Sequence, residues 1–220
     1  MYSDNGILSC DDQGTFGFSK MLDCLLTSSM DQSIKNKVSL EWVQNHSVLI
    51  IAKLRGYQYN LAKNFETDML TPETLMEQLR YRADLEFIDG KRSILFRISE
   101  GDLSPNQPMI LYLSSHIPLR LSDGWYQANI TGDHLIEKRL LKTKIGQKVL
   151  ICGASLGKDA KNGHPLECPQ VLSISANSTR RVKWDTKLGY FYSKIPPTPL
   201  SCLDDAGGLV YRLGSDRRKF

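Results

Sequence analysis

The spacing of apolar residues changes once along the chain, and this change limits the folds that it can adopt. From residue 39 to residue 101 apolar side chains recur at helical intervals, whereas after residue 108 they alternate at period two. The stretch from Asn106 to Pro108 separates the two patterns and reads as a hinge. Helices followed by a run of short strands predict an α+β chain with two parts.

Start and stop signals mark the helices of the first part. Thr71-Pro72-Glu73 supplies an N-cap residue, a proline suited to the first turn and an acidic residue favoured by the helix dipole. A shorter helix is expected from Arg92 to Ser99. We therefore expect a helical domain over residues 38–105, with Trp42 as one of its core residues.

Several short strands and one helix follow the hinge. The expected strands begin near Met109, Leu119, Tyr126, Gln147 and Val171, and the expected helix lies within residues 134–142. This pattern suits a five-stranded oligonucleotide-binding (OB) barrel over residues 106–213. We expect a flexible N-terminal leader at residues 1–37, because it is polar and rich in Ser and Asp, and a basic tail at residues 214–220.

Basic residues concentrate in the second part. The whole chain has a formal net charge of +4. Residues 137–187 carry 11 basic and 4 acidic side chains, a net charge of +7, while residues 38–105 carry 8 and 10, a net charge of −2. This asymmetry favours a polyanionic partner, although a solvated Lys/Arg surface has the same composition.

Several function classes are disfavoured by the composition. The five cysteines have no Cys-x-x-Cys spacing, which predicts reduced thiols rather than a disulfide framework or a zinc site. No apolar run is long enough for a signal peptide or a membrane span. The four histidines are scattered, and no phosphate-binding glycine loop or nucleophile elbow is present. We therefore expect neither enzymatic activity nor a cofactor or bound metal.

Interleaved basic and aromatic residues form the candidate DNA-binding set. Its members are Lys142, Lys144, Lys148, Arg180, Arg181, Lys183, Trp184 and Lys187, with Tyr190 and Tyr192 nearby in sequence. Single-stranded DNA needs cations along its phosphates and aromatic faces against its bases. The competing interpretation is that Trp184 and Tyr190 are packing residues and that the basic side chains are simply solvated.

Motifs in both parts resemble one known family. The second part contains Asp123-Gly124-Trp125-Tyr126, Ile145-Gly146-Gln147-Lys148-Val149-Leu150, Ser175-Ala176-Asn177-Ser178-Thr179-Arg180 and Trp184-Asp185-Thr186-Lys187-Leu188-Gly189-Tyr190-Phe191. The first part contains Glu41-Trp42-Val43-Gln44-Asn45-His46, Ile50-Ile51-Ala52-Lys53-Leu54, Leu70-Thr71-Pro72-Glu73 and Gln78-Leu79-Arg80-Tyr81-Arg82. In this order they resemble the helical domain and first OB barrel of the breast-cancer type 2 susceptibility protein family, over about Val38 to Gly208. The resemblance implies that Asp123, Gly124 and Trp125 are structural landmarks.

The resemblance also implies a function and partners. The family acts in the nucleus in homologous recombination at double-strand breaks, where it displaces single-strand-binding protein and loads a RecA-like recombinase on single-stranded DNA. Its helical domain and first barrel together hold a small, very acidic protein associated with split-hand/split-foot malformation. Basic residues suggested as contacts for this acidic protein are Arg80, Arg82, Lys91, Arg92 and Arg97.

Two alternatives to DNA binding stay open at the level of the sequence. The chain can be a protein-interaction scaffold that binds the acidic partner with little or no direct DNA binding, or a barrel that binds structured RNA. The family continues into further barrels that carry much of its DNA contact. We therefore expect this chain to be a fragment, a truncated isoform or a reduced homologue.

Overall fold

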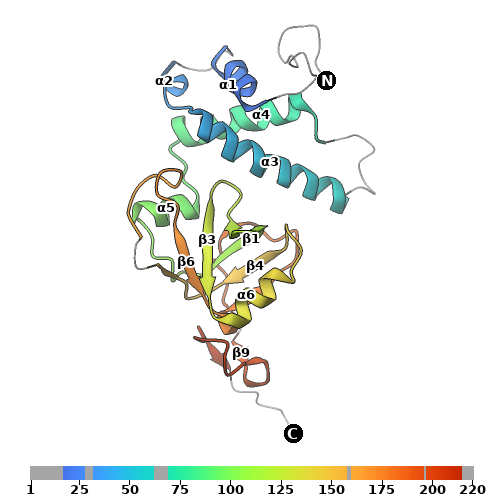
Figure 1. The fold of residues 1–220 in the computed structure, drawn as a ribbon, viewed down its shortest axis with the longest axis vertical. Coiled ribbons are helices and arrows are strands. Elements are labelled where there is room, and N and C mark those ends of the chain that lie inside the picture. The colour runs from blue at the N-terminus through green and yellow to red at the C-terminus, as the bar shows by residue number, and fades with distance from the viewer. Residues whose placement is uncertain (1–16, 28–31, 62–68, 158–159, 196, 215–220) are drawn as a thin grey trace. The chain divides into compact units, whose positions relative to one another are not determined.

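The computed structural model describes residues 17–27, 32–61, 69–157, 160–195 and 197–214. The chain divides into two compact units, Met1–Arg92 and Ser93–Phe220, called here the helical unit and the barrel unit. The first contains only helices among its described residues, and the second is built on a curled mixed sheet (Figure 1). The predicted α+β class, with helices first and an OB barrel second, is confirmed. No helix in the described residues is long and apolar enough to cross a membrane.

The helical unit follows the start signals of the sequence. Its elements are α1 (Phe18–Thr27), α2 (Gln32–Lys35), α3 (Leu40–Leu61), α4 (Pro72–Ala83) and the π-helical turn η1 (Asp84–Ile88). The Ser39 hydroxyl accepts a hydrogen bond from the Trp42 backbone N–H at 3.1 Å, and Thr71 caps α4 by accepting from the Thr74 N–H at 3.2 Å. Both caps satisfy backbone donors that a helix leaves open at its N-terminus.

The core of the helical unit contains a buried polar group around Trp42. Trp42 is 2% exposed, and its indole N–H donates to Glu86 Oε2 at 3.0 Å. An Arg82 nitrogen lies 3.0 Å from His46 Nδ1. Because a guanidinium only donates, Nδ1 is the acceptor. In the neutral ring the proton is then on Nε2, which lies 3.6 Å from Glu86 Oε2. Trp42 is therefore both a packing residue and a hydrogen-bond donor.

The flexible leader expected at residues 1–37 is wrong where the structure describes it. Met21 and Leu25 of α1 and Ile34 of α2 are buried, and the Ser47 hydroxyl lies 3.3 Å from the sulfur of Met21. Met21 and Leu25 are four residues apart and therefore share one helix face. This short apolar stripe is enough to dock α1 although the segment is polar on average. Residues 1–16 and 28–31 lie outside the described residues.

The barrel unit is built on one eight-stranded sheet. Its elements are α5 (Ile94–Glu100), β1 (Met109–His116), β2 (Leu119–Ser122), β3 (Gln127–Gly132), α6 (His134–Leu141), β4 (Lys148–Ile151), β5 (Ser155–Leu156), β6 (Val171–Ile174), η2 (Ala176–Ser178), β7 (Thr179–Arg181) and β8 (Gly189–Tyr190). The strand order is β5-β6-β3-β2-β1-β4-β7, with β8 also paired to β1. A separate parallel pair is formed by β9 (Thr198–Pro199) and β10 (Leu213–Gly214), with η3 (Leu200–Cys202) after β9.

One continuous segment, residues 171–181, joins the two sides of the sheet. Its first half, β6, pairs in parallel with β3, and its last residues, β7, pair antiparallel with β4. Only the turn through η2 separates these two pairings. The sheet therefore curls around a core that includes Leu111 of β1 and Ile136 of α6.

The predicted domain boundary at residue 105 is wrong by the contacts of α5. Ile94, Leu95, Phe96 and Ile98 belong to the barrel core. The boundary between the compact units accordingly falls between Arg92 and Ser93. The helical spacing of α5 predicted its secondary structure correctly but gave no information about which core its apolar face joins.

The Asp-Gly-Trp-Tyr motif ties α5 to the sheet. Asp123 is buried, and its Oδ1 accepts from the backbone N–H groups of Trp125 and Tyr126, each at 2.9 Å. Its Oδ2 accepts from the N–H of Leu95 in the first turn of α5, also at 2.9 Å. Gly124 adopts φ +92°, a conformation that favours glycine. The carboxylate thus satisfies three backbone donors from two elements.

Candidate nucleic-acid interface

A segment that we call the covering strap, residues 182–195, packs on the face of β1 and β4 opposite the barrel core. Its apolar side chains Val182, Leu188, Phe191 and Ile195 pack against Ile110, Leu150 and Cys152. Lys183, Trp184 and Lys187 are exposed, with Trp184 at 41%. The strap therefore buries apolar side chains beneath it and presents cations and an indole to solvent.

Hydrogen bonds fix the part of the strap that carries Trp184. The Val182 N–H donates to the Lys148 carbonyl at 3.1 Å, and the Gln147 side chain donates to the Val182 carbonyl at 2.9 Å. The Thr186 N–H donates to the Lys183 carbonyl at 3.2 Å and closes a turn. Trp184 is thus presented on an ordered turn, which reduces the entropy lost on binding a ligand.

Lys148 supports this turn from below. Its Nζ donates to the Thr186 carbonyl at 2.6 Å. Burial lowers the pKa of the Lys148 ammonium, and the nearby Asp185 carboxylate opposes this effect. Of the predicted DNA-binding lysines, Lys148 is therefore a support for the strap rather than a freely exposed cation.

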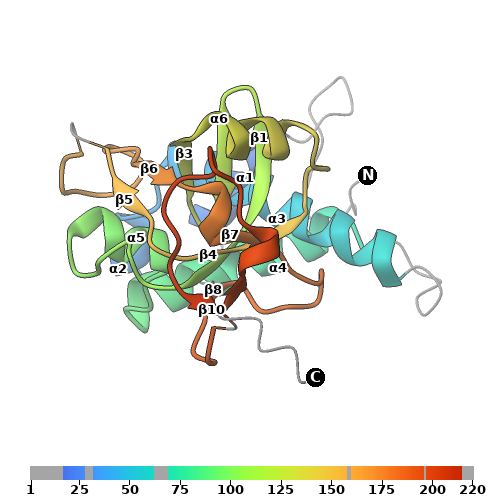
Figure 2. The same cartoon turned by 90° about the horizontal axis from the view of Figure 1, so that it is seen from below.

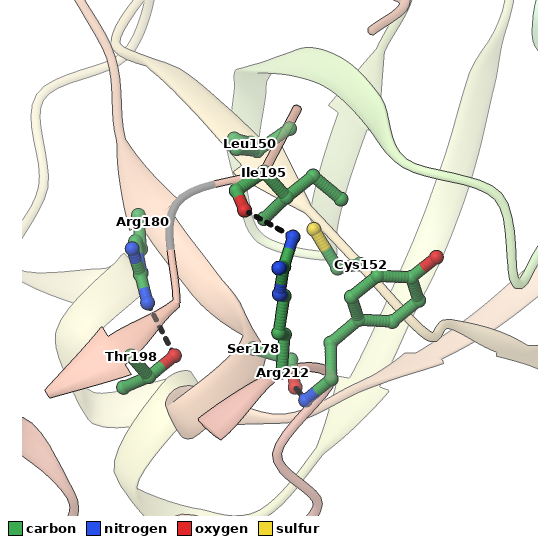
Figure 3. A pocket seen from close by; sticks show the side chains of 8 residues that line it. Leu150, Cys152, Ser178, Arg180, Ile195, Thr198 and Arg212 are labelled. Atoms are coloured by element: carbon green, nitrogen blue, oxygen red, sulfur yellow. Dashed lines mark hydrogen bonds between the residues drawn. The ribbon is translucent and has the colours of Figure 1, made fainter. Parts of the chain in front are cut away.

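Arg180 and Arg181 point to opposite faces of β7, since side chains alternate along a strand. Arg180 is half-buried, donates to Thr198 Oγ1, and lines a cavity of about 10 Å³ together with Leu150 and Cys152 (Figure 3). Such a cavity has room for about one water molecule. Figure 2 shows the C-terminal segment that carries Thr198 lying over this part of the sheet. Arg181 is exposed, and its Nη2 lies 3.4 Å from Thr143 Oγ1.

This separation predicts different effects for the two arginines. Arg180→Gln is expected to lower the free energy of unfolding by about 1 kcal/mol, because a buried hydrogen bond is lost, and to leave the affinity for single-stranded DNA unchanged. Arg181→Gln is expected to leave stability unchanged and to reduce the slope of log K against log salt by about 0.7. Urea unfolding and fluorescence anisotropy measure the two quantities. A loss of DNA affinity in the Arg180 variant alone contradicts the assignment.

The structure brings Arg181 together with two further cations. Lys142 and Lys144 are exposed on either side of Thr143, just after α6, and Thr143 is the residue that Arg181 reaches. We call the exposed set, with the strap, the basic surface; its members are Lys142, Lys144, Arg181, Lys183, Trp184 and Lys187. Sequence reasoning missed Gln147 and Thr186, which hold the strap in place, and their residue types carried no signal for this role.

The predicted contacts for the acidic partner are not all surface residues. Arg82 is buried against His46, and the prediction that it is a partner contact is wrong, because its side chain is committed to the core. Arg80 is half-buried, Lys91 is exposed and lies 3.1 Å from Asp89, and Arg92 is exposed. Arg97 belongs to the barrel unit, where its guanidinium lies 6.0 Å from the centre of the Tyr190 ring.

The C-terminal segment is held by the turn between β6 and β7. Asn177 is buried, and its side-chain N–H₂ donates to the carbonyls of Asp204 and Gly208, each at 3.0 Å. Its side-chain oxygen accepts from the Asp204 N–H at 3.0 Å. The structure thus assigns Asn177 an anchoring role. Of the basic tail predicted at residues 214–220, all but Gly214 lies outside the described residues.

Cys152 beneath the strap is expected to resist alkylation. Burial raises the pKa of its thiol to about 11, against the opposing effect of the Arg180 guanidinium. At about pH 8 its thiolate fraction is then on the order of a hundredfold below that of an unperturbed cysteine. Iodoacetamide followed by mass spectrometry should therefore modify the exposed Cys202 first. Equal rates in the native protein, matching those in urea, would show that the strap does not cover Cys152.

Comparisons with known proteins agree with this architecture. The family model described as BRCA2, oligonucleotide/oligosaccharide-binding, domain 1 matches residues 93–192, and the BRCA2 helical model matches residues 1–90. The helical match includes the segment expected to be a leader. Among described residues no group of His, Cys, Asp or Glu is arranged to hold a metal ion. Both matched domains are binding and interaction modules, not enzymes.

Two relatives come from Arabidopsis thaliana, the proteins BREAST CANCER SUSCEPTIBILITY 2 homolog A and homolog B. Each is 30% identical over 197 residues, which cover 78% of this chain and 17% of the relative. The chain therefore spans about a sixth of the length of the relatives that it matches. With the helical domain and the first barrel matched in order along one chain, the protein belongs to the BRCA2 family.

Proposed function

We propose that this chain is a DNA-repair module of a homologous-recombination mediator that binds single-stranded DNA on the basic surface. The observation that carries this proposal is the covering strap, which presents Trp184 between Lys183 and Lys187 on an ordered turn. Membership of the BRCA2 family supports the DNA-repair role. The module acts in the nucleus and supports the loading of a RecA-like recombinase.

The physical basis is a division of labour between cations and rings. Lysine and arginine side chains neutralise phosphates and release counterions, while an indole stacks on a base, which is worth about 1–3 kcal/mol. Lys142, Lys144 and Arg181 add cations around Thr143, beside the strand from which the strap begins. Binding of this kind has little sequence preference and depends strongly on salt.

The test is the affinity of the purified chain for a fluorescent single-stranded oligonucleotide at about 50 mM and about 200 mM salt. We expect binding that weakens with salt, and a preference for single-stranded DNA over duplex DNA and hairpin RNA. No binding at the lower salt contradicts the proposal. A preference for hairpin RNA favours recognition of structured RNA instead.

A second candidate function is a scaffold that binds the small acidic protein and contacts little DNA. Two observations favour it: Arg180 and Lys148 are engaged inside the barrel unit, and Lys91 and Arg92 are exposed cations in the helical unit. Repeating the titration with the acidic protein present separates the two functions. A tight complex with that protein and no DNA binding supports the scaffold, whereas DNA affinity that persists in the complex supports the DNA-binding module.

A further inference from the structure

Two tyrosines at the end of the strap form an exposed aromatic pair. The Tyr190 and Tyr192 ring centres are 5.7 Å apart, with 41° between the ring planes. Tyr192 is 91% exposed, while Tyr190 is half-buried and packs against the barrel core. The Arg97 guanidinium lies 6.0 Å from the Tyr190 ring centre. A cation, a supporting ring and a free ring therefore lie within one small area.

The backbone beneath the pair is ordered by the sheet. Tyr190 pairs with Met109 of β1, and the Phe191 N–H donates to the Pro108 carbonyl at 3.1 Å. Phe191 packs against the face of the sheet that the strap covers. Because side chains alternate along a strand, Tyr190 and Tyr192 point to the other side. The exposed ring of Tyr192 is thus held on a strand rather than on a free loop.

We propose that the Tyr192 ring, supported by Tyr190, is a stacking platform for a base of single-stranded nucleic acid, with Arg97 as its cationic neighbour. This inference rests on the proposed DNA binding and extends it to a second stacking position beyond Trp184. An exposed tyrosine gains nothing from burial in the free protein, whereas a base that covers it removes apolar surface from water and adds ring contact.

The charges around the pair favour a polyanion over an apolar protein surface. Lys187 precedes the pair and Lys194 follows it, both exposed, and no acidic residue occurs from Thr186 to Ile195. Five residues separate Lys187 from Tyr192, so their α-carbons are at most about 18 Å apart. One short single strand can therefore contact the lysine through a phosphate and the tyrosine through a base.

The experiment compares Tyr192→Leu with Tyr192→Phe in the full chain. The ligand is a single-stranded oligonucleotide that contains 2-aminopurine, whose fluorescence falls when it stacks on a ring. Tyr192→Leu is expected to weaken binding about fivefold to a hundredfold, to abolish part of the fluorescence loss, and to leave the salt slope unchanged, because no phosphate contact is removed. Tyr192→Phe keeps the ring and should bind as the wild type does. The matched control is Tyr59→Leu, which removes a tyrosine that is 84% exposed on α3.

A second oligonucleotide with abasic sites separates stacking from phosphate contact. On this ligand wild type and Tyr192→Leu should bind equally, since there is no base to stack. Normal DNA binding by wild type and by Tyr192→Leu alike overturns the platform and leaves the proposed function intact. Absence of DNA binding by the wild type overturns both. Equal losses in Tyr192→Leu and Tyr192→Phe overturn the platform too, because they assign the effect to the hydroxyl group.

Discussion

Replacing Asp123 with alanine is expected to lower the free energy of unfolding of the barrel unit by about 3–6 kcal/mol. The carboxylate accepts hydrogen bonds from the backbone N–H groups of Leu95, Trp125 and Tyr126. Each buried donor that is left without a partner costs about 1–3 kcal/mol. Since a domain is stable by only about 5–15 kcal/mol in total, a change of this size removes much of the stability of the barrel unit.

Urea unfolding followed by circular dichroism measures this change, and hydrogen exchange of the Leu95 amide locates it. Asp123→Asn should cost less than Asp123→Ala, because one side-chain oxygen is retained and can still accept from Trp125 and Tyr126. Asp205→Ala, at an exposed aspartate, is the matched control and should change stability by less than about 0.5 kcal/mol. A loss below about 1 kcal/mol in Asp123→Ala would mean that water replaces the carboxylate, and the motif would then not hold α5 in place.

The second large effect is expected on DNA binding. The triple variant Lys183→Gln/Trp184→Leu/Lys187→Gln should weaken binding to single-stranded DNA about a hundredfold at low salt. Loss of two phosphate contacts should reduce the slope of log K against log salt by about 1.4, and loss of the indole removes about 1–3 kcal/mol of stacking. Anisotropy titrations over a range of salt concentrations measure both quantities, and because all three side chains are exposed, the variant should keep its stability.

The matched control carries the same change of net charge elsewhere in the chain. Lys20 and Lys37 are exposed lysines of the helical unit, and Lys20→Gln/Lys37→Gln should leave the salt slope unchanged. If both variants weaken binding to the same extent, the effect belongs to the total charge of the protein, and the strap is not the DNA site.

The sequence predicted features that depend on neighbouring residues. The Ser39 and Thr71 caps, the helical spacing of α3 and α4, and the alternation in β1 and β3 are all local signals, and the structure contains each of these elements. The family resemblance predicted the order of the two domains, and the family matches confirm it.

Long-range partners explain what the sequence did not predict. Arg82 appeared to be a surface cation because its partner, His46, is 36 residues away. The short helix α5 was assigned to the helical domain because its contact with Asp123 spans 28 residues. The Arg180–Arg181 pair was treated as one site, although neighbours on a strand face opposite sides, and here one side is covered by the segment that carries Thr198. Composition and spacing alone contain none of these pairings.

The covering strap divides its two tasks between different side chains of one segment. Val182, Leu188, Phe191 and Ile195 hold the barrel closed on one face, while Lys183, Trp184, Lys187 and Tyr192 contribute little to folding. Mutations at the second set therefore escape selection for stability and are subject to selection for ligand binding alone. Within one lineage, affinity for DNA can be gained or lost at these positions while the architecture of the barrel persists.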